Sequence, residues 1–503
     1  MDPPVSADVG RLTQDLILAG SRAVRHVPGA VGGLGTYFVA LDELAAGQES
    51  HDWRRDEKIL ITRADRALER RRITSAVRWF DKALRVAYHP TLHMGAESPL
   101  VEDPEAFLRP LRASRTGQVL LESPIPEGTA PRRPGPRSGE GASGDGEQVV
   151  HLLVIAQQNW TFLRPLLDAL RETGRFEILE FEVDGLPETD RPDRERILRA
   201  RYDLVTEGRR IPTPERLVEA YEWADVAFVE WGHHILSWIT MLDMAPRRLV
   251  ARYHRFEAFT PFPLLHDHSV IDHLLHVSPP IRGLVTAIAP ESTSVPTDIV
   301  GNLLSRGLGA VSDAPRDTRV IVQVGWNREI KDVLFSLDLI ERLHREDPAY
   351  RLKLVGPGLP DLPAEDTPYQ SRVRQRLAAL PSGVVEQLGV RRDVPEIFAA
   401  AGVVLSSSFG EGTHESVMEG LATGCPAVVR DWPHARDYGG ASSIYREQWV
   451  VPDVETAAQR IRELQDPGRY AEESVAAREW AVLHRSPERV VDDYDHALRA
   501  SRC

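Results

Sequence analysis

Short apolar runs alternate with amphipathic stretches along most of this 503-residue chain. Runs such as 149–156, 225–230 and 320–324 have the length and composition of buried parallel strands. Stretches such as 161–173 and 332–344 carry apolar residues at spacings of three and four, which predicts amphipathic helices. Strands that alternate with helices in this way predict an α/β fold of the doubly wound kind.

The alternation occurs in two series, which predicts two Rossmann-like lobes. The first series has strands at 149–156, 176–182, 225–230, 248–253 and 274–278 and helices at 161–173 and 214–223. The second has strands at 320–324, 352–355, 384–388, 402–405 and 427–429 and helices at 332–344, 370–380, 394–401 and 417–422. We expect a first lobe at 149–311, a second lobe at 312–470 and a C-terminal helical segment at 471–503.

A stretch of Pro, Gly, Ser and charged residues at 123–148 separates these lobes from the N-terminal part of the chain. Its composition predicts a flexible linker. Residues 1–122 are expected to be a helical region, because 59–68 and 73–88 carry apolar residues at helical spacing. These two stretches predict a helical hairpin, with a buried side formed by Ala76, Phe80, Ala83 and Leu84.

Charge limits the classes of partner. The formal net charge of −14, from 61 basic and 75 acidic residues, argues against a dedicated nucleic-acid binder. Residues 63–85 nevertheless hold eight Arg or Lys against three Asp or Glu, a local balance of +5. A basic face of this kind can contact an anionic membrane surface or an acidic acceptor, but a solvated surface in an Arg-rich protein is the favoured interpretation.

Cysteine usage and hydropathy indicate the compartment. The chain has two cysteines, Cys425 and Cys503, so neither a disulfide framework nor a CxxC metal site is expected. The longest apolar runs are far shorter than the ~20 residues that span a bilayer. We therefore expect a cytoplasmic protein without a secretory signal, with peripheral membrane contact as a further expectation.

The segment from Ser408 to Val429, SFGEGTHESVMEGLATGCPAVV, carries the most specific pattern. It joins a strand, a Gly-Glu-Gly turn, a helix and a second strand without a break. Glu411 and Glu419 are separated by seven residues, which puts one carboxylate in the loop and the other about two turns into the helix. Both can face a ligand at the strand end, where open α/β sheets bind their ligands.

This segment resembles the Glu, seven residues, Glu signature of retaining GT-B glycosyltransferases, particularly family 4, the glycosyl transferases group 1. The resemblance covers roughly residue 149 to the C-terminus, and it implies two lobes facing a cleft, with a C-terminal helix that crosses back onto the first. It implies that Glu411 holds hydroxyls of the donor sugar and Glu419 the ribose hydroxyls. The residues between them, including Gly412, Thr413 and His414, would meet the diphosphate at the helix N-terminus.

A second segment, from Gly325 to Lys331, follows one strand and precedes a helix. Cleavage of a glycosyl–phosphate bond develops charge on the leaving diphosphate, so a transferase without a metal needs fixed cations there. The segment resembles the Gly-Arg…Lys-Gly segment of the family, which implies that Lys331 and Arg328 clamp the diphosphate. It departs from the family at Trp326, where the Arg usually stands.

Glycines at other strand ends extend the resemblance. Gly356 follows the strand at 352–355, and Gly389 with Val390 follows the strand at 384–388. In the family, the backbone at such positions contacts the nucleotide, and glycine permits the close approach. We therefore assign Gly325, Gly356, Gly389 and Val390 to the predicted donor site.

Histidines follow two strands of the first lobe. His254 resembles the histidine that reaches the donor sugar in the family, whereas a packed or capping histidine is the alternative. His233 and His234 follow the strand at 225–230 and are candidates for the acceptor side. The turn at 157–160 lacks the Gly-rich loop of many relatives, so the resemblance does not define the acceptor contacts.

Together, these residues predict a retaining glycosyltransferase that moves a sugar from a nucleotide-diphosphate sugar, a UDP-sugar by family resemblance. The acceptor stays open between lipid-linked, polysaccharide and small-molecule classes. No metal and no cofactor is expected, because no His, Asp or Glu spacing demands a metal site. The alternatives are a non-catalytic GT-B-like binding or scaffold protein and a sugar-nucleotide epimerase.

Overall fold

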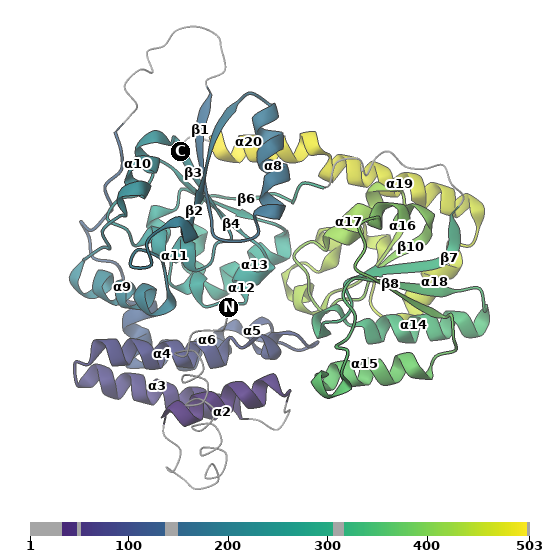
Figure 1. Ribbon diagram of the computed structural model, residues 1–503, viewed down its shortest axis with the longest axis horizontal. Coiled ribbons are helices and arrows are strands. Elements are labelled where there is room, and N and C mark those ends of the chain that lie inside the picture. The colour runs from purple at the N-terminus through teal and green to yellow at the C-terminus, as the bar shows by residue number, and fades with distance from the viewer. Residues whose placement is uncertain (1–32, 48–51, 136–148, 305–315, 500–503) are drawn as a thin grey trace, which may run out of the picture.

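The computed structural model describes residues 33–47, 52–135, 149–304 and 316–499. In these ranges it has two six-stranded parallel sheets flanked by helices, one in each of two lobes, and an N-terminal group of helices beneath the first lobe (Figure 1). This arrangement confirms the predicted GT-B fold class.

The first lobe contains the sheet with strand order β2-β1-β3-β4-β5-β6. Its strands are β1 (Val150–Ala156), β2 (Phe176–Glu182), β3 (Val226–Glu230), β4 (Leu249–Tyr253), β5 (His273–His276) and β6 (Thr297–Ile299). Its helices are α8 (Trp160–Glu172), α9 (Arg194–Glu207), α10 (Glu215–Trp223), α11 (His234–Thr240), α12 (Arg255–Ala258) and α13 (Pro279–Ile288). Helix α9 and strand β6 were not among the predicted elements, because charged residues interrupt the apolar spacing of α9 and β6 is very short.

The second lobe contains the sheet with strand order β12-β11-β10-β7-β8-β9. Its strands are β7 (Asp317–Val324), β8 (Arg351–Val355), β9 (Val385–Gly389), β10 (Ala401–Ser406), β11 (Ala427–Arg430) and β12 (Val450–Val451). Its helices are α14 (Val333–Glu346), α15 (Pro368–Ala379), α16 (Val394–Ala400), α17 (Glu415–Ala422) and α18 (Val454–Glu463). Chain order reverses between β7 and β10, and the carboxyl ends of strands at such a switch point form the usual ligand site.

The helical region consists of α2 (Gly33–Ala45), α3 (Trp53–Glu69), α4 (Ile73–Ala87), α5 (Pro99–Glu102), α6 (Pro104–Ala113) and α7 (Arg115–Gly117), with the short turn η1 (Pro90–His93). Helices α3 and α4 form the predicted hairpin, and Phe80 and Leu84 are fully buried. They belong to one hydrophobic cluster with Ile197 and Leu198 of α9 and with the inner face of the first sheet. The helical region and the first lobe therefore share a single core.

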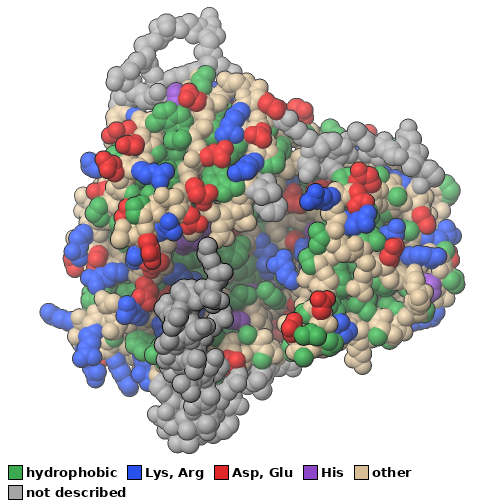
Figure 2. Space-filling view, in the orientation of Figure 1, with side chains coloured by type: hydrophobic (Ala, Val, Ile, Leu, Met, Phe, Trp, Pro, Cys, Tyr) green, Lys and Arg blue, Asp and Glu red, His purple; other side chains and the backbone are tan. Residues whose placement is uncertain are grey.

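The basic face of this hairpin is partly neutralised. Arg78 pairs with Glu195 at 2.8 Å, and Arg85 pairs with Asp81 at 2.7 Å. Residues 70–72, at the turn between the two helices, are exposed. Lys and Arg side chains accordingly gather on the surface of the helical region (Figure 2).

The first part of the segment expected to be a flexible linker is anchored to the first lobe. The Arg132 amide donates to the Asp243 carbonyl at 2.9 Å. The Arg133 guanidinium pairs with Asp272 at 2.8 Å and also donates to the Val270 carbonyl. Residues 136–148 of the expected linker, and the expected boundary between the lobes at 311 and 312, lie outside the described residues.

Two C-terminal helices connect the lobes. Helix α19 (Pro467–Arg485), which runs through the expected division at 470 and 471, packs on α17. Helix α20 (Pro487–Arg499) crosses to the first lobe and packs on α8 (Figure 1). Val490 and Tyr494 of α20 are buried among residues of the first sheet. None of the helices in the described ranges is long and apolar enough to cross a membrane.

Candidate active site

The loops that follow β7 and β10 are joined to each other at the switch point of the second sheet. The Phe409 amide donates to the Ile330 carbonyl at 2.8 Å. The Ser407 hydroxyl donates to the Lys331 carbonyl at 2.7 Å, and the Gln323 side-chain amide donates to the same carbonyl at 3.2 Å. These bonds fix the Lys331 backbone against the loop that carries Glu411.

Lys331 and Glu411 form an ion pair in this joined region. Lys331 Nζ lies 2.6 Å from Glu411 Oε1, and the two side chains are 16% and 13% exposed. Burial disfavours the charged form of Glu411, but the Lys331 ammonium, His414 and a hydrogen bond from Ser408 together more than offset this effect, and the pKa of Glu411 falls to about 2. A carboxylate in this state can accept hydrogen bonds from hydroxyl groups at any physiological pH.

The predicted donor-site glycines lie in a row at the ends of neighbouring strands. Gly325, Gly356 and Gly389 follow or end β7, β8 and β9, and all three have positive φ. The Gly325 amide donates to the Val355 carbonyl, and the Gly356 amide donates to the Gly389 carbonyl, each at 2.8 Å. A Cβ at Gly325 would lie 3.3 Å from Lys331 Cε, so this glycine also leaves space for the lysine stem. Val390, next in the chain, is 76% exposed.

The start of α17 holds the remaining predicted donor contacts. His414 has a left-handed backbone, and its buried ring lies with Nδ1 2.6 Å from the Ser406 hydroxyl. Burial lowers the pKa of His414 to about 4, so the ring is neutral near pH 7. Burial, with added repulsion from Glu415, raises the pKa of Glu419 to about 7. The sugar, phosphate and ribose roles of these residues stay predictions.

Across the cleft, His254 is held by a buried carboxylate. His254 Nε2 lies 2.5 Å from Glu230 Oε1, and the ring stacks on Trp231 at 4.0 Å. Burial disfavours the charge of Glu230, but Arg252 and His254 more than offset this effect and lower its pKa. Because Glu230 accepts from Nε2, it fixes the orientation of the His254 ring.

This carboxylate belongs to a network that joins the two lobes. Arg252 lies 3.4 Å from Glu230 and also donates to the Tyr494 hydroxyl and to the Asn302 side-chain oxygen. The Asn302 amide in turn donates to Glu415 Oε1 at 2.9 Å, on the first turn of α17. The position of His254 is thereby connected to the helix that carries Glu419.

Two side chains of this region were not found from the sequence, Arg255 and His434. Arg255 packs over the α17 loop, because a Cβ built on Gly412 would lie 3.8 Å from Arg255 Cβ. Its Nη2 donates to His434 Nδ1 at 3.2 Å. Arg255 follows His254 directly, so the histidine segment could have pointed to it, whereas no motif marks His434, which lies after β11.

Trp326 and Arg328, in the segment predicted to clamp the diphosphate, differ in exposure. Trp326 is 1% exposed and packs in the core of the second lobe. Arg328 is exposed and has no acidic partner within the described residues. Figure 2 shows Lys and Arg side chains in the hollow between the lobes. The clamp role of Arg328 stays a prediction.

The histidines predicted for the acceptor side lie at the end of β3. The rings of His233 and His234 stack at 4.4 Å, and His234 Nε2 lies 2.8 Å from the Gln157 side-chain oxygen. Burial lowers the pKa of His233 to about 3 and that of His234 to about 4. Both are therefore neutral, and their acceptor role also stays a prediction.

A cavity of about 380 Å³ lies between the lobes, beside the start of α17. Its lining includes Ser278 of the first lobe, Thr413 and Met418 of the second, and Trp480 and Arg485 of α19. Within the described ranges, no group of three or more His, Cys, Asp or Glu side chains could hold a metal ion.

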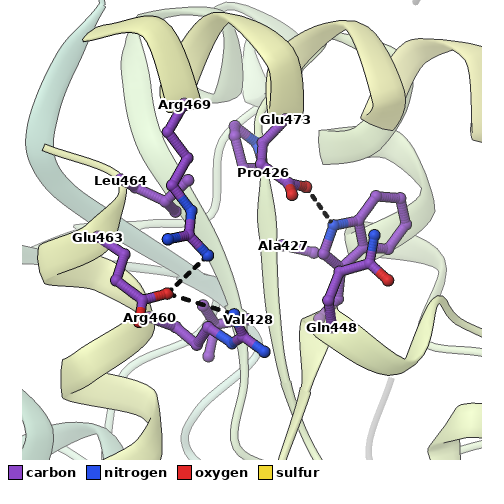
Figure 3. Close-up of a pocket in the computed structure, with 10 residues that line it drawn as sticks. Pro426, Ala427, Val428, Gln448, Arg460, Glu463, Leu464, Arg469 and Glu473 are labelled. Carbon is purple, nitrogen blue, oxygen red and sulfur yellow. Dashed lines mark hydrogen bonds and ion pairs between the residues drawn. The ribbon is translucent and has the colours of Figure 1, made fainter. Parts of the chain in front are cut away.

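A crevice under α18 and α19 is much smaller, about 20 Å³ (Figure 3). Glu463 there accepts from Arg460 at 3.2 Å and from Arg469 at 2.8 Å. The Trp449 indole donates to Glu473 at 2.8 Å. These contacts join α18 to α19 and join α19 to the Trp449 side chain.

Comparison with solved structures gives distant likenesses. TarM is 12% identical over 55% of each chain, with a TM-score of 0.44. The pneumococcal O-GlcNAc transferase GtfA, in complex with UDP and GlcNAc, is 12% identical over 54% of this chain and 56% of its own, with a TM-score of 0.41. Anabaena HepE, in complex with UDP and glucose, is 14% identical over 70% of this chain and 100% of its own, with a TM-score of 0.46. The chain thus spans about half the length of TarM and GtfA.

Comparison with protein families gives a match within the second lobe. Residues 318–466 match the family described as Glycosyl transferases group 1. The matched range contains Lys331, Glu411 and Glu419, so it confirms the resemblance predicted from the segment around the two glutamates. Most of the second lobe of this chain is therefore similar to the glycosyl transferases group 1 family, a family of glycosyltransferases.

Proposed function

We propose that this protein transfers a sugar from a UDP-sugar to an acceptor hydroxyl with retention of the anomeric configuration. The observation that carries this proposal is the Lys331–Glu411 pair at the switch point of a lobe that is similar to a glycosyltransferase family. In the family, these positions meet the diphosphate and the donor sugar, and the structure has a cation and an ionised carboxylate side by side there.

Each residue of the pair has a separate task. Lys331 stabilises the charge that develops on the leaving diphosphate, together with the backbone N–H groups at the start of α17. Glu411 accepts hydrogen bonds from hydroxyls of the sugar, for which its low pKa keeps it charged. Glu419, two turns along α17, accepts from the ribose hydroxyls. His254 orients the sugar from the first lobe, and Glu230 holds the imidazole ring.

No side chain need act as a nucleophile in this reaction. The bond between the anomeric carbon and the phosphate oxygen breaks, and a bond to the acceptor oxygen forms on the same face of the sugar. The acceptor hydroxyl gives its proton to the departing phosphate oxygen, so atoms and charge balance without another reactant. The residues of the cleft position the two substrates and stabilise the charge on the leaving group.

Binding and slow hydrolysis of UDP-, GDP-, ADP- and CDP-sugars by the purified protein test the proposal. We expect one UDP-sugar to be hydrolysed by the wild type and by an Arg376→Ala control, whose arginine is paired on the surface of α15. Hydrolysis should be lost in Glu411→Ala and Lys331→Ala. Absence of binding to every nucleotide would refute the proposal and favour a binding or scaffold role.

A further inference from the structure

A further cavity, of about 540 Å³, lies where the chain passes from the helical region into the first lobe. Its apolar wall includes Leu121 and Ile125 from the segment that follows α7 and Leu264 from the segment between β4 and β5. None of the residues predicted for the donor site is among its described lining residues. A cavity of this size can hold a small organic molecule, apart from the cleft between the lobes.

Arg201 of α9 contributes a buried cation to this cavity. The residue is 6% exposed, and its Nε donates to the Leu120 carbonyl at 3.1 Å. Its buried Nη1 has no hydrogen-bond partner within the described ranges. Burial lowers the pKa of Arg201, and Asp267 and Glu291 oppose this effect without forming an ion pair with it in the described part of the chain. An arginine stays charged at any physiological pH, so a buried N–H group of this cation lacks an acceptor, which is costly.

Most other charged groups of the cavity wall are already paired. Arg210 Nη2 lies 2.6 Å from Asp267 Oδ2, with side-chain exposures of 5% and 2%, and its Nε and Nη1 donate to two backbone carbonyls. Glu122 pairs with Arg112 at 3.1 Å. Arg201 is therefore left as the cation available to a ligand.

His268 supplies a second unpartnered nitrogen. It lines the same cavity at the start of η5 (His268–Val270) and is 8% exposed. Its buried Nε2 has no hydrogen-bond partner among the residues that the structure describes. Burial lowers the pKa of His268 to about 4, so the ring is neutral near pH 7. A neutral imidazole with its proton on Nε2 can donate one hydrogen bond to a ligand oxygen without adding charge.

We propose that this cavity binds a small carboxylic acid with an apolar body, whose carboxylate is held by Arg201 and His268. The planar fork of a guanidinium matches the two oxygens of a carboxylate. One negative charge balances the one unpaired arginine. The second charge of a phosphate would find no free cation among the described lining residues and would be repelled by the exposed Glu291. Such a site lies outside the predicted donor site and does not depend on the proposed sugar transfer.

The ligand would connect the helical region to the first lobe. Arg201 belongs to α9, which packs on α4 of the helical region and on η2 (Gln118–Glu122) (Figure 1). The segment after η2 forms another part of the cavity wall. A ligand that binds the folded chain and not the unfolded one raises Tm, so occupancy should stabilise the core that these two parts share.

Calorimetric titration of the full chain with benzoate, phenyl phosphate and benzyl alcohol tests the site. We expect benzoate to bind at one site and to raise Tm. Benzyl alcohol lacks the charge and should bind about tenfold more weakly, and Arg201→Gln should weaken benzoate binding by a similar factor, the order of a charge-assisted hydrogen bond. Arg201→Lys keeps the charge without the planar fork and should recover part of the loss. Arg171→Gln, at a surface pair of the same lobe, serves as the matched control.

A second variant tests the cavity without touching the buried arginine. Ser294→Trp, at an exposed position of the cavity wall, should block benzoate binding and leave the core unchanged. Benzoate binding that does not saturate, or that is as tight in Arg201→Gln and Ser294→Trp as in the wild type, would overturn the site. Tighter binding of phenyl phosphate than of benzoate would overturn the assignment to a carboxylic acid. Circular dichroism checks the fold of each variant, and Ser294→Trp carries the test alone if Arg201→Gln does not fold.

Discussion

Replacing Lys331 with Met should destabilise the second lobe more than removing both charges of its ion pair. The two side chains lie 2.6 Å apart with 16% and 13% exposure, and Met keeps most of the apolar stem of the lysine. Removal of one partner from a buried pair costs ~3–5 kcal/mol, because the other charge stays buried alone. The slight exposure of this pair places the expected loss at the lower end, about 3 kcal/mol at pH 7.

The loss should depend on pH in a defined direction. In the wild type, the pKa of Glu411 falls from 4.5 to about 2, so the stabilisation is present above about pH 4.5 and disappears as the pH falls towards 2. In Lys331→Met the main cause of that depression is absent, and burial then favours the neutral acid. The difference from the wild type should therefore shrink between pH 7 and pH 4.

Urea unfolding followed by tryptophan fluorescence measures this difference, since Trp326 and Trp432 are buried in the second lobe. The double variant Lys331→Met with Glu411→Gln should recover at least half of the loss. A loss below about 1 kcal/mol at pH 7, the range of exposed pairs, would refute the reasoning. So would a double variant as unstable as the single one.

Three further predictions follow from packing and burial. Gly420→Ala should cost about 1–3 kcal/mol in urea unfolding, because the new Cβ would lie 2.8 Å from Val404 Cγ1, while Ser416→Ala on the same helix should cost little. UDP binding should tighten as the pH rises through about 7, where Glu419 ionises, and Glu419→Gln should remove this dependence in a titration series. Deletion of residues 487–503 should expose the apolar surface of the first lobe that α20 covers and make this lobe sensitive to limited proteolysis, whereas a truncated chain as resistant as the wild type would contradict the shared core.

The strand and helix pattern was sufficient to predict both lobes. Parallel strands buried on both faces are continuous apolar runs, and such runs are visible in a single sequence. The sequence also placed Lys331 and Glu411 each in a loop that follows a strand, but the ion pair between them became visible only in the structure. Their roles came from the family resemblance.

Features that depend on the approach of distant segments could not be predicted. Arg255 reaches its neighbours only when the first lobe lies against the loop at Gly412, and no local pattern encodes that distance. The apolar faces of the hairpin at 53–87 look the same whether they bury each other or another domain, so the core they share with α9 was not visible. In the sequence, Trp326 is only a departure from a cation motif. Its role in the core of the second lobe depends on packing that the sequence does not show.

The cleft is restrained at two separate edges. At one edge, η1 and α5 of the helical region meet the segment after β11, where His434 donates to the Gly95 carbonyl and Tyr438 to the Val101 carbonyl. At the other, Arg485 of the crossing helices donates to the Asn302 carbonyl at 2.9 Å.

At the first edge the lobes are joined by hydrogen bonds, whereas at the second they are joined by the chain itself through α19 and α20. The two hydrogen bonds of the first edge contribute roughly 1 kcal/mol each, and the contact between Arg255 and His434 lies beside them. Separation of the lobes would break these contacts between the N-terminal helices and the second lobe. A ligand or surface that binds those helices would thereby change the free energy of separating the lobes.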